Sequence, residues 1–123
     1  IPHPITDGLP WSDRPPLIGG FNEFSQKTGC QTLLHSMRFE ASFADATVNL
    51  EPSSTAPLLV TGNHGAGRTA ALATDVAPHW IGPMVDWGTE RVTACADGAG
   101  DVEVGNLYAA FFRNLLSWTA NLT

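Results

Sequence analysis

Two apolar runs joined by a glycine-rich link constrain most strongly how this chain can fold. Residues 57–62 (PLLVTG) and 68–75 (RTAALATD) flank residues 63–67 (NHGAG). Two β-rich runs with a short link of this kind are typical of a β-hairpin, in which Gly65 and Gly67 would supply positive φ angles. Both runs are continuously apolar rather than alternating. We therefore expect both strands to be covered on both faces, as in an α/β sheet with helices on each side.

Other segments predict further elements. Residues 106–122 place apolar side chains at spacings of three and four behind Asn106, which can cap a helix, so we expect an amphipathic helix of about four turns. Residues 30–39 are apolar enough for one strand, although their mixed periodicity also fits a short helix. Residues 17–24 favour a short strand. The small and polar residues of 90–105 favour an insertion or a flexible loop.

Size and charge bound the class of protein. The 123 residues, 43% of them hydrophobic, suit one domain with one core, so we treat 1–123 as a single domain. The net charge of −6 and the scattered basic residues argue against a nucleic-acid partner and an anionic membrane surface. No apolar run reaches the ~20 residues that span a bilayer, and we expect a cytoplasmic protein. The chain begins with Ile1 rather than Met, so we also expect a segment to precede it.

The two cysteines, Cys30 and Cys95, either pair or stay reduced, and free thiols are the favoured reading. Their spacing matches neither a redox motif nor a zinc site, and no other metal motif occurs. The sequence therefore indicates no metal and no cofactor. Gly65 and Gly67 do not form a phosphate loop, because the link joins two strands and offers no helix N-terminus to an anion.

A series of motifs runs through most of the chain. Residues 58–80 contain a strand, a glycine turn ending in Arg68, a second strand and the loop D-x-x-P-H-W, and Asp86-Trp87 follows. Upstream lie H-P-I-T-x-G-L at 3–9 and Gly20-Phe21-Asn22. This order resembles the glutamine-amidotransferase-like family, relatives of class I amidotransferase domains and of ThuA-like proteins. The resemblance implies the C-terminal half of a flavodoxin-like, doubly wound sheet, completed by an N-terminal segment or by a separate partner chain.

The chain departs from the family pattern in three respects. Asn63 and His64 stand where the family turn has Glu and Tyr, residues 90–105 are inserted after Trp87, and the N-terminal βαβ portion is missing. In class I amidotransferases that portion carries the nucleophilic cysteine on a strand-to-helix elbow. Neither Cys30 nor Cys95 lies in a G-x-C-x-G setting.

Candidate site residues follow from the motifs. Asp75 and His79 lie four residues apart, so the carboxylate could fix the imidazole tautomer of a general base; alternatively, Asp75 caps a turn while His79 packs beside Trp80. Trp80 and Trp87 offer stacking faces to a small molecule, although a structural role is favoured. His64, in the glycine turn, could reach a site but is more simply read as solvated.

Asn22 is a candidate substrate-binding residue through its place in the family's G-Y-N element, and it completes the predicted set. Two functions then remain open. One is amide hydrolysis or transfer, with the nucleophile supplied by the N-terminal half. The other is a non-catalytic domain of the same fold that binds a small molecule or assembles a homo-oligomer through its tryptophan-bearing loop.

Overall fold

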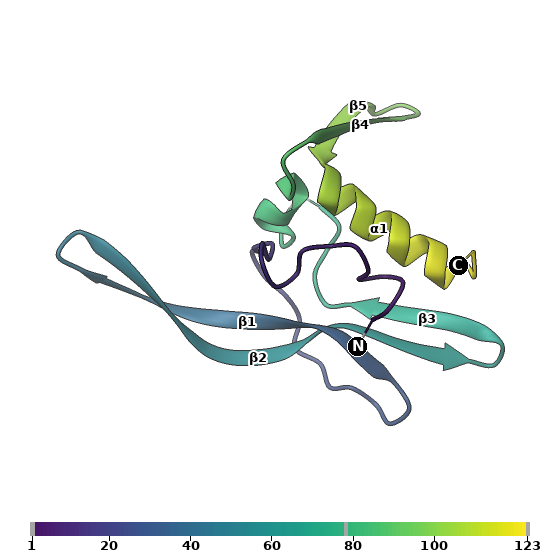
Figure 1. Cartoon of the computed structure of the whole chain (residues 1–123), viewed down its shortest axis with the longest axis horizontal. Helices are drawn as coiled ribbons and strands as arrows, with labels where there is room; N and C mark the ends of the chain where they lie inside the picture. Colours follow the sequence, from purple (N-terminus) through teal and green to yellow (C-terminus); the bar gives the residue numbers. More distant parts are fainter. Residues whose placement is uncertain (1, 78, 123) are drawn as a thin grey trace.

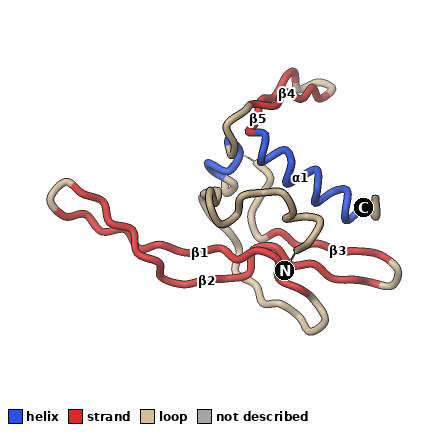
Figure 2. Tube along the Cα trace, viewed as in Figure 1, coloured by secondary structure: helices blue, strands red, loops and turns tan. Residues whose placement is uncertain are grey.

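The computed structural model describes residues 2–77 and 79–122. It contains an antiparallel three-stranded sheet, a separate two-stranded hairpin, a short 3-10 helix and one α-helix at the C-terminal end (Figures 1 and 2). In chain order the elements are β1 (Gln31–Ala44), β2 (Thr47–His64), β3 (Gly67–Leu72), η1 (Gly82–Asp86), β4 (Arg91–Ala96), β5 (Gly100–Gly105) and α1 (Asn106–Thr119). The fold is therefore α/β, with a sheet of antiparallel strands and a C-terminal helix.

The predicted hairpin is confirmed as β2 and β3, which pair from Leu59↔Leu72 to His64↔Gly67. The turn has positive φ at Gly65 (60°) but not at Gly67. Burial differs between the two strands. Residues 58–61 of β2 are buried on both faces, whereas exposed and half-buried residues alternate along β3. The expectation that both strands are covered on both faces was thus wrong for β3, which is an edge strand whose outer face meets solvent.

Strand β1 settles the ambiguity of residues 30–39 in favour of a strand and continues well beyond them. It pairs with β2 as far as Ala44↔Thr47, and a two-residue turn of Asp45 (φ 51°) and Ala46 (φ 62°) closes the ribbon. We call residues 39–52 the β1–β2 arm. The arm projects away from the rest of the molecule in Figures 1 and 2, and all its residues are exposed.

Two other segments differ from expectation. Residues 90–105 form the regular hairpin β4–β5, with a loop at 97–99, instead of an irregular loop. Residues 17–24 form no strand. Their backbone instead lies against the segment after β3, where the Asn22 N–H donates to the Ala73 carbonyl at 2.7 Å.

The C-terminal helix α1 occurs where the apolar spacing predicts it, with Tyr108 and Phe111 buried. Its cap differs from the prediction, because Gly105 occupies the N-cap position and the Asn106 side chain makes no cap bond. The Asn106 Oδ1 atom instead accepts from the Glu90 N–H at 3.2 Å, which fastens the start of α1 to the start of β4.

A single hydrophobic cluster lies between β2 and α1, closed by the N-terminal loop and η1. Phe111 is its centre, with Trp11 at 5.3 Å edge-on and Phe112 at 5.1 Å. The cluster's buried members come from the N-terminal loop, the sheet, η1 with its flanks, and α1: Ile5, Leu59, Ile81, Met84, Trp87, Tyr108 and Phe111. The core therefore joins segments from the whole length of the chain.

Candidate functional site

The segment between β3 and β4 carries most of the predicted site residues. We call residues 75–87 the tryptophan loop; position 78 lies outside the described residues. Asp75 organises its first half, since Oδ2 accepts the Trp80 N–H at 3.1 Å and Oδ1 accepts the Ile81 N–H at 2.6 Å. The bond from Trp80 is the main cause that lowers the pKa of Asp75, with further lowering from the Ile81 and His79 N–H groups and from the His79 charge. Asp75 thus acts as the cap of the turn that carries His79.

His79 is exposed on this turn. Both oxygens of the Asp75 carboxylate accept hydrogen bonds from backbone N–H groups. Asp75 therefore fixes the position of the turn that carries the His79 imidazole, and its oxygens are not reserved for the imidazole. The charges of the two side chains still attract each other. The structure therefore brings the predicted pair together, with the carboxylate in the turn-capping role that the sequence left as an alternative.

Helix α1 anchors the same loop from the core side. The Tyr108 hydroxyl donates to the Val76 carbonyl at 2.7 Å. Burial first, and then the charge of Asp75, raise the pKa of Tyr108, so the phenol stays protonated and keeps its donor role. The sequence gave no sign of this contact, since a tyrosine at a helical core position predicts only packing.

Trp80 joins the tryptophan loop to residues 19–22. Its carbonyl accepts the N–H groups of Gly19 (2.7 Å) and Gly20 (3.0 Å), and its indole lies so close to Gly20 that a Cβ there would approach the ring to 3.3 Å. The side chain is 43% exposed, so one face remains available. Asn22 follows with an exposed side chain. Asn22 and Trp80 therefore lie on adjoining segments.

Two other predicted residues lie away from this group. Trp87 is buried in the core, where its Nε1–H donates to the Arg14 carbonyl at 2.8 Å and its ring lies 4.7 Å from that of Trp11. These contacts are those of a packing residue, the role that the sequence favoured over contact with a substrate. His64 is exposed at the end of β2, next to the hairpin turn, whereas Asp75 follows the far end of β3, a strand of six residues that spans about 20 Å. His64 therefore does not meet the loop.

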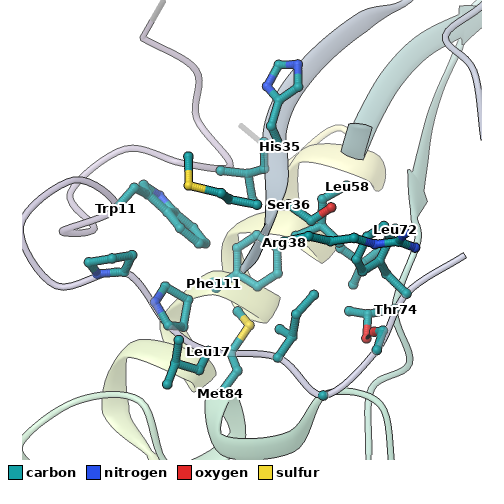
Figure 3. Close-up of a pocket in the computed structure, with 18 of the residues that line it drawn as sticks. Trp11, Leu17, His35, Ser36, Arg38, Leu58, Leu72, Thr74, Met84 and Phe111 are labelled. Atoms are coloured by element: carbon teal, nitrogen blue, oxygen red, sulfur yellow. Dashed lines mark hydrogen bonds between the residues drawn. The ribbon is translucent and has the colours of Figure 1, made fainter. Parts of the chain in front are cut away.

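An open apolar groove of about 850 Å³ borders residues 19–20, and Figure 3 shows it in close-up. Phe111, Met84 and Leu58 lie in its interior. His35, Arg38 and Thr74 bring polar groups to its wall; Arg38 pairs with Glu23 at 2.8 Å. Its apolar lining also includes Trp11, Leu17, Ile18, Phe21, Leu33, Leu34, Met37, Phe39 and Leu72. Sequence reasoning missed this groove because its walls come from six separate segments of the chain.

The H-P-I-T-x-G-L segment has a structural explanation. The His3 carbonyl accepts the N–H groups of Thr6 and Asp7, the His3 Nδ1 atom accepts the Ile5 N–H at 3.2 Å, and Ile5 is completely buried. Gly8 closes the turn with a φ of 73°. This motif therefore builds a tight turn that inserts one side chain into the core.

The described part of the chain carries two thiols that form no disulfide. Cys30 and Cys95 are free, as favoured from the sequence. The Cys95 thiol lies 2.6 Å from an oxygen of Asp101, and that bond, followed by burial, raises the pKa of Cys95. In the part of the chain that the structure describes, no cluster of His, Cys, Asp and Glu could hold a metal ion. In the same part, no helix has the length and apolar character to cross a bilayer.

An α/β chain with a glycine-turn hairpin, a D-x-x-P-H-W loop capped by its own aspartate and a closing helix has the features of an amidotransferase-like domain. Comparison with known families agrees. Residues 1–93 match the family described as "Putative glutamine amidotransferase", and the chain belongs to that family. The match includes β1, β2, β3 and the tryptophan loop, and it ends within β4. No curated protein matches the chain.

Proposed function

We propose that this chain is the C-terminal part of a flavodoxin-like amidotransferase-like domain and that its tryptophan loop contributes to a site for amide hydrolysis or transfer. The nucleophile comes from an N-terminal segment or a partner chain. The observation that carries the proposal is the turn held by Asp75, which presents His79 to solvent in a chain of this family. In open α/β sheets, ligands bind at loops that follow the strands, as the tryptophan loop follows β3.

In this proposal His79 is the general base. Its imidazole takes the proton from an incoming thiol or hydroxyl as that group attacks the carbonyl carbon of the amide, and returns the proton to the leaving nitrogen. Asp75 is a positioning residue, because it acts through the turn. Trp80 and Asn22 form the adjoining wall, where the exposed indole face packs against the apolar part of a small substrate.

The thiols of this chain support an external nucleophile. A nucleophilic cysteine needs a lowered pKa, whereas the pKa of Cys95 is raised by Asp101 and by burial. Cys30 stands just before β1, outside any strand-to-helix elbow. Free thiols are also typical of the reducing cytoplasm, where we place the protein.

The open groove supports the same arrangement. An apolar groove of about 850 Å³ next to the core is costly to leave in water, and a doubly wound sheet has both faces covered. We assign the groove to the N-terminal half of the domain, whose helix or strand would cover the exposed Leu17 at its wall. Native and denaturing mass spectrometry tests this directly: release of a second polypeptide on denaturation supports a two-chain domain.

A second candidate function is a non-catalytic domain that binds a small molecule. The engagement of both Asp75 oxygens by backbone N–H groups favours it, because a carboxylate used this way stabilises a loop whether or not a reaction follows. Under this alternative the exposed face of Trp80 binds the ligand and His79 only lines the site.

An assay of glutamine hydrolysis separates the two functions. The assay uses the protein that contains both this chain and its nucleophile segment. We expect His79→Ala to lower kcat by at least about 100-fold, the usual contribution of a general base. His64→Ala is the matched control, since His64 is equally exposed but lies at the far end of β3. If His79→Ala retains the turnover of the unaltered protein, the catalytic proposal fails and the binding function stands.

A further inference from the structure

The β1–β2 arm has two faces of opposite character. Cross-strand partners share a face in an antiparallel ribbon, and the pairs Phe39↔Pro52, Ala41↔Leu50 and Phe43↔Val48 place only apolar side chains on one of them. The alternate pairs, Glu40↔Glu51, Ser42↔Asn49 and Ala44↔Thr47, form the other face, which is mainly polar. The arm is thus amphipathic along its whole length.

The apolar face is open to solvent. Phe43 is 80% exposed, Leu50 62%, Val48 54% and Phe39 48%. Met37 lies at the root of the arm, beyond a register shift; it lines the same groove as Phe39 and is 50% exposed. An isolated two-stranded ribbon is marginally stable in water, and soluble monomers rarely expose an apolar patch larger than a few hundred Å². This face therefore needs a partner.

We propose that the partner is a second copy of this chain, with two arms packed apolar face to apolar face about a two-fold axis. In such an isologous contact, the tip residue Phe43 of one copy meets the root residues Met37 and Phe39 of the other, and the reverse holds by symmetry. The two ribbons then form a four-stranded sandwich whose apolar side chains are covered on both sides.

The size of the face fits a dimer contact. Its five large side chains expose on the order of 500 Å² per copy. With the rim of the ribbon added, this approaches the ~800 Å² per partner of a standard interface. Each free strand of the arm spans six residues, about 20 Å, so two arms aligned in opposite directions overlap fully.

Charge also favours face-to-face packing. Two copies of a chain with a net charge of −6 repel each other over most of their surfaces. The apolar face carries no charged side chain, and packing on it leaves Glu40 and Glu51, which lie directly opposite each other, pointing outward into water. Met37 and Phe39 also line the groove of the proposed function, so the two contacts meet at the root of the arm. Phe43 and Leu50 lie outside the groove lining, so substitutions there test the dimer separately.

Sedimentation equilibrium of the whole chain tests the proposal. We expect a species of twice 13.1 kDa at micromolar to 100-micromolar concentration, whereas Phe43→Ser combined with Leu50→Ser weakens the dimer by roughly 30-fold or more. Asn49→Ser, on the polar face of the same arm, is the matched control and keeps the dimer. Circular dichroism verifies that each variant retains its fold.

Cysteine cross-linking gives a second measurement on the folded chain. In a background with Cys30→Ser and Cys95→Ser, Ala41→Cys lies near the centre of the apolar face, so mild oxidation links two copies. Ser42→Cys, one residue away on the opposite face, does not link them. Three results would overturn the proposal. The first is a monomer at all concentrations, the second is a dimer that the Phe43 and Leu50 substitutions do not weaken, and the third is equal cross-linking from positions 41 and 42. Coverage of the arm by another segment would produce the first of these results.

Discussion

Truncation of Trp87 tests whether this residue belongs to the core or to a ligand site. The side chain is only 8% exposed and stacks at 4.7 Å on Trp11. Burying an indole removes about 150–250 Å² from water, worth about 4–6 kcal/mol at ~25 cal/mol per Å² as an upper bound. Measured truncations of buried aromatic residues cost about 3–5 kcal/mol. We therefore expect Trp87→Ala to lose about 3–5 kcal/mol of unfolding free energy, a large share of the ~5–15 kcal/mol typical of a domain.

Two further variants refine this test. Trp87→Phe keeps most of the apolar contact but removes the 2.8 Å bond from Nε1–H to the Arg14 carbonyl, so we expect a loss of about 1–2 kcal/mol. Trp80→Ala, at a position that is 43% exposed, should cost less than half as much as Trp87→Ala. Urea denaturation followed by circular dichroism measures all three. A Trp87→Ala loss below about 1 kcal/mol would refute the packing argument and return this residue to the candidate binding site.

Two other predictions concern the N-terminal turn and the base of α1. Burial and, second, the Arg68 charge lower the pKa of His3 below 6.5. Just below pH 6.5 the unfolded state therefore binds more protons than the folded state. The stability contributed by neutral His3 is complete above pH 6.5 and declines as the pH falls toward the folded-state pKa. Urea titrations at several pH values should show this slope flattened in His3→Gln, and an unchanged slope contradicts the assignment. Gly88 has a φ of 119°, and a Cβ there would overlap the Asn106 side chain. Gly98 is the control, because its φ is also positive, at 80°, but the space around it is open. We expect Gly98→Ala to cost ~1 kcal/mol of unfolding free energy and Gly88→Ala to cost more. Thermal melts of the two variants check this. Equal losses of stability would contradict the argument, because they would show that the Asn106 side chain moves aside at no cost.

The sequence predicted the elements whose signal is local. The β2–β3 hairpin followed from two apolar runs around a glycine link, and α1 followed from apolar spacing. The β4–β5 hairpin had a comparable signal, because Asp97-Gly98 is a turn dipeptide between alternating apolar residues, but the small side chains concealed it. The arm had one too, in the alternation of Met37, Phe39 and Phe43.

The site was less predictable because its contacts link distant segments. The motif placed Asp75 and His79 together, yet nothing local shows that both carboxylate oxygens would bind the Trp80 and Ile81 backbone. For Trp87 the sequence favoured a structural role but left contact with a ligand open, because a tryptophan in a proline-rich and glycine-rich stretch also suggests a surface loop. Only the tertiary structure shows the Arg14 carbonyl that its N–H meets.

The end of α1 packs on the turn formed by residues 3–8 and on β3. The Trp118 ring lies 5.0 Å from that of His3, its carbonyl accepts from Arg68 at 3.0 Å, and Asn114 donates to the Ile5 carbonyl at 3.4 Å. The contacts of His3 and Ile5 with α1 join residues more than a hundred positions apart, and contacts of such long range slow folding because the loop must close before they form. During synthesis the first turn of the chain must therefore wait, without its packing partners, until α1 has left the ribosome. Folding of this chain should accordingly be late and cooperative, with a period in which the apolar strands depend on chaperones to stay apart.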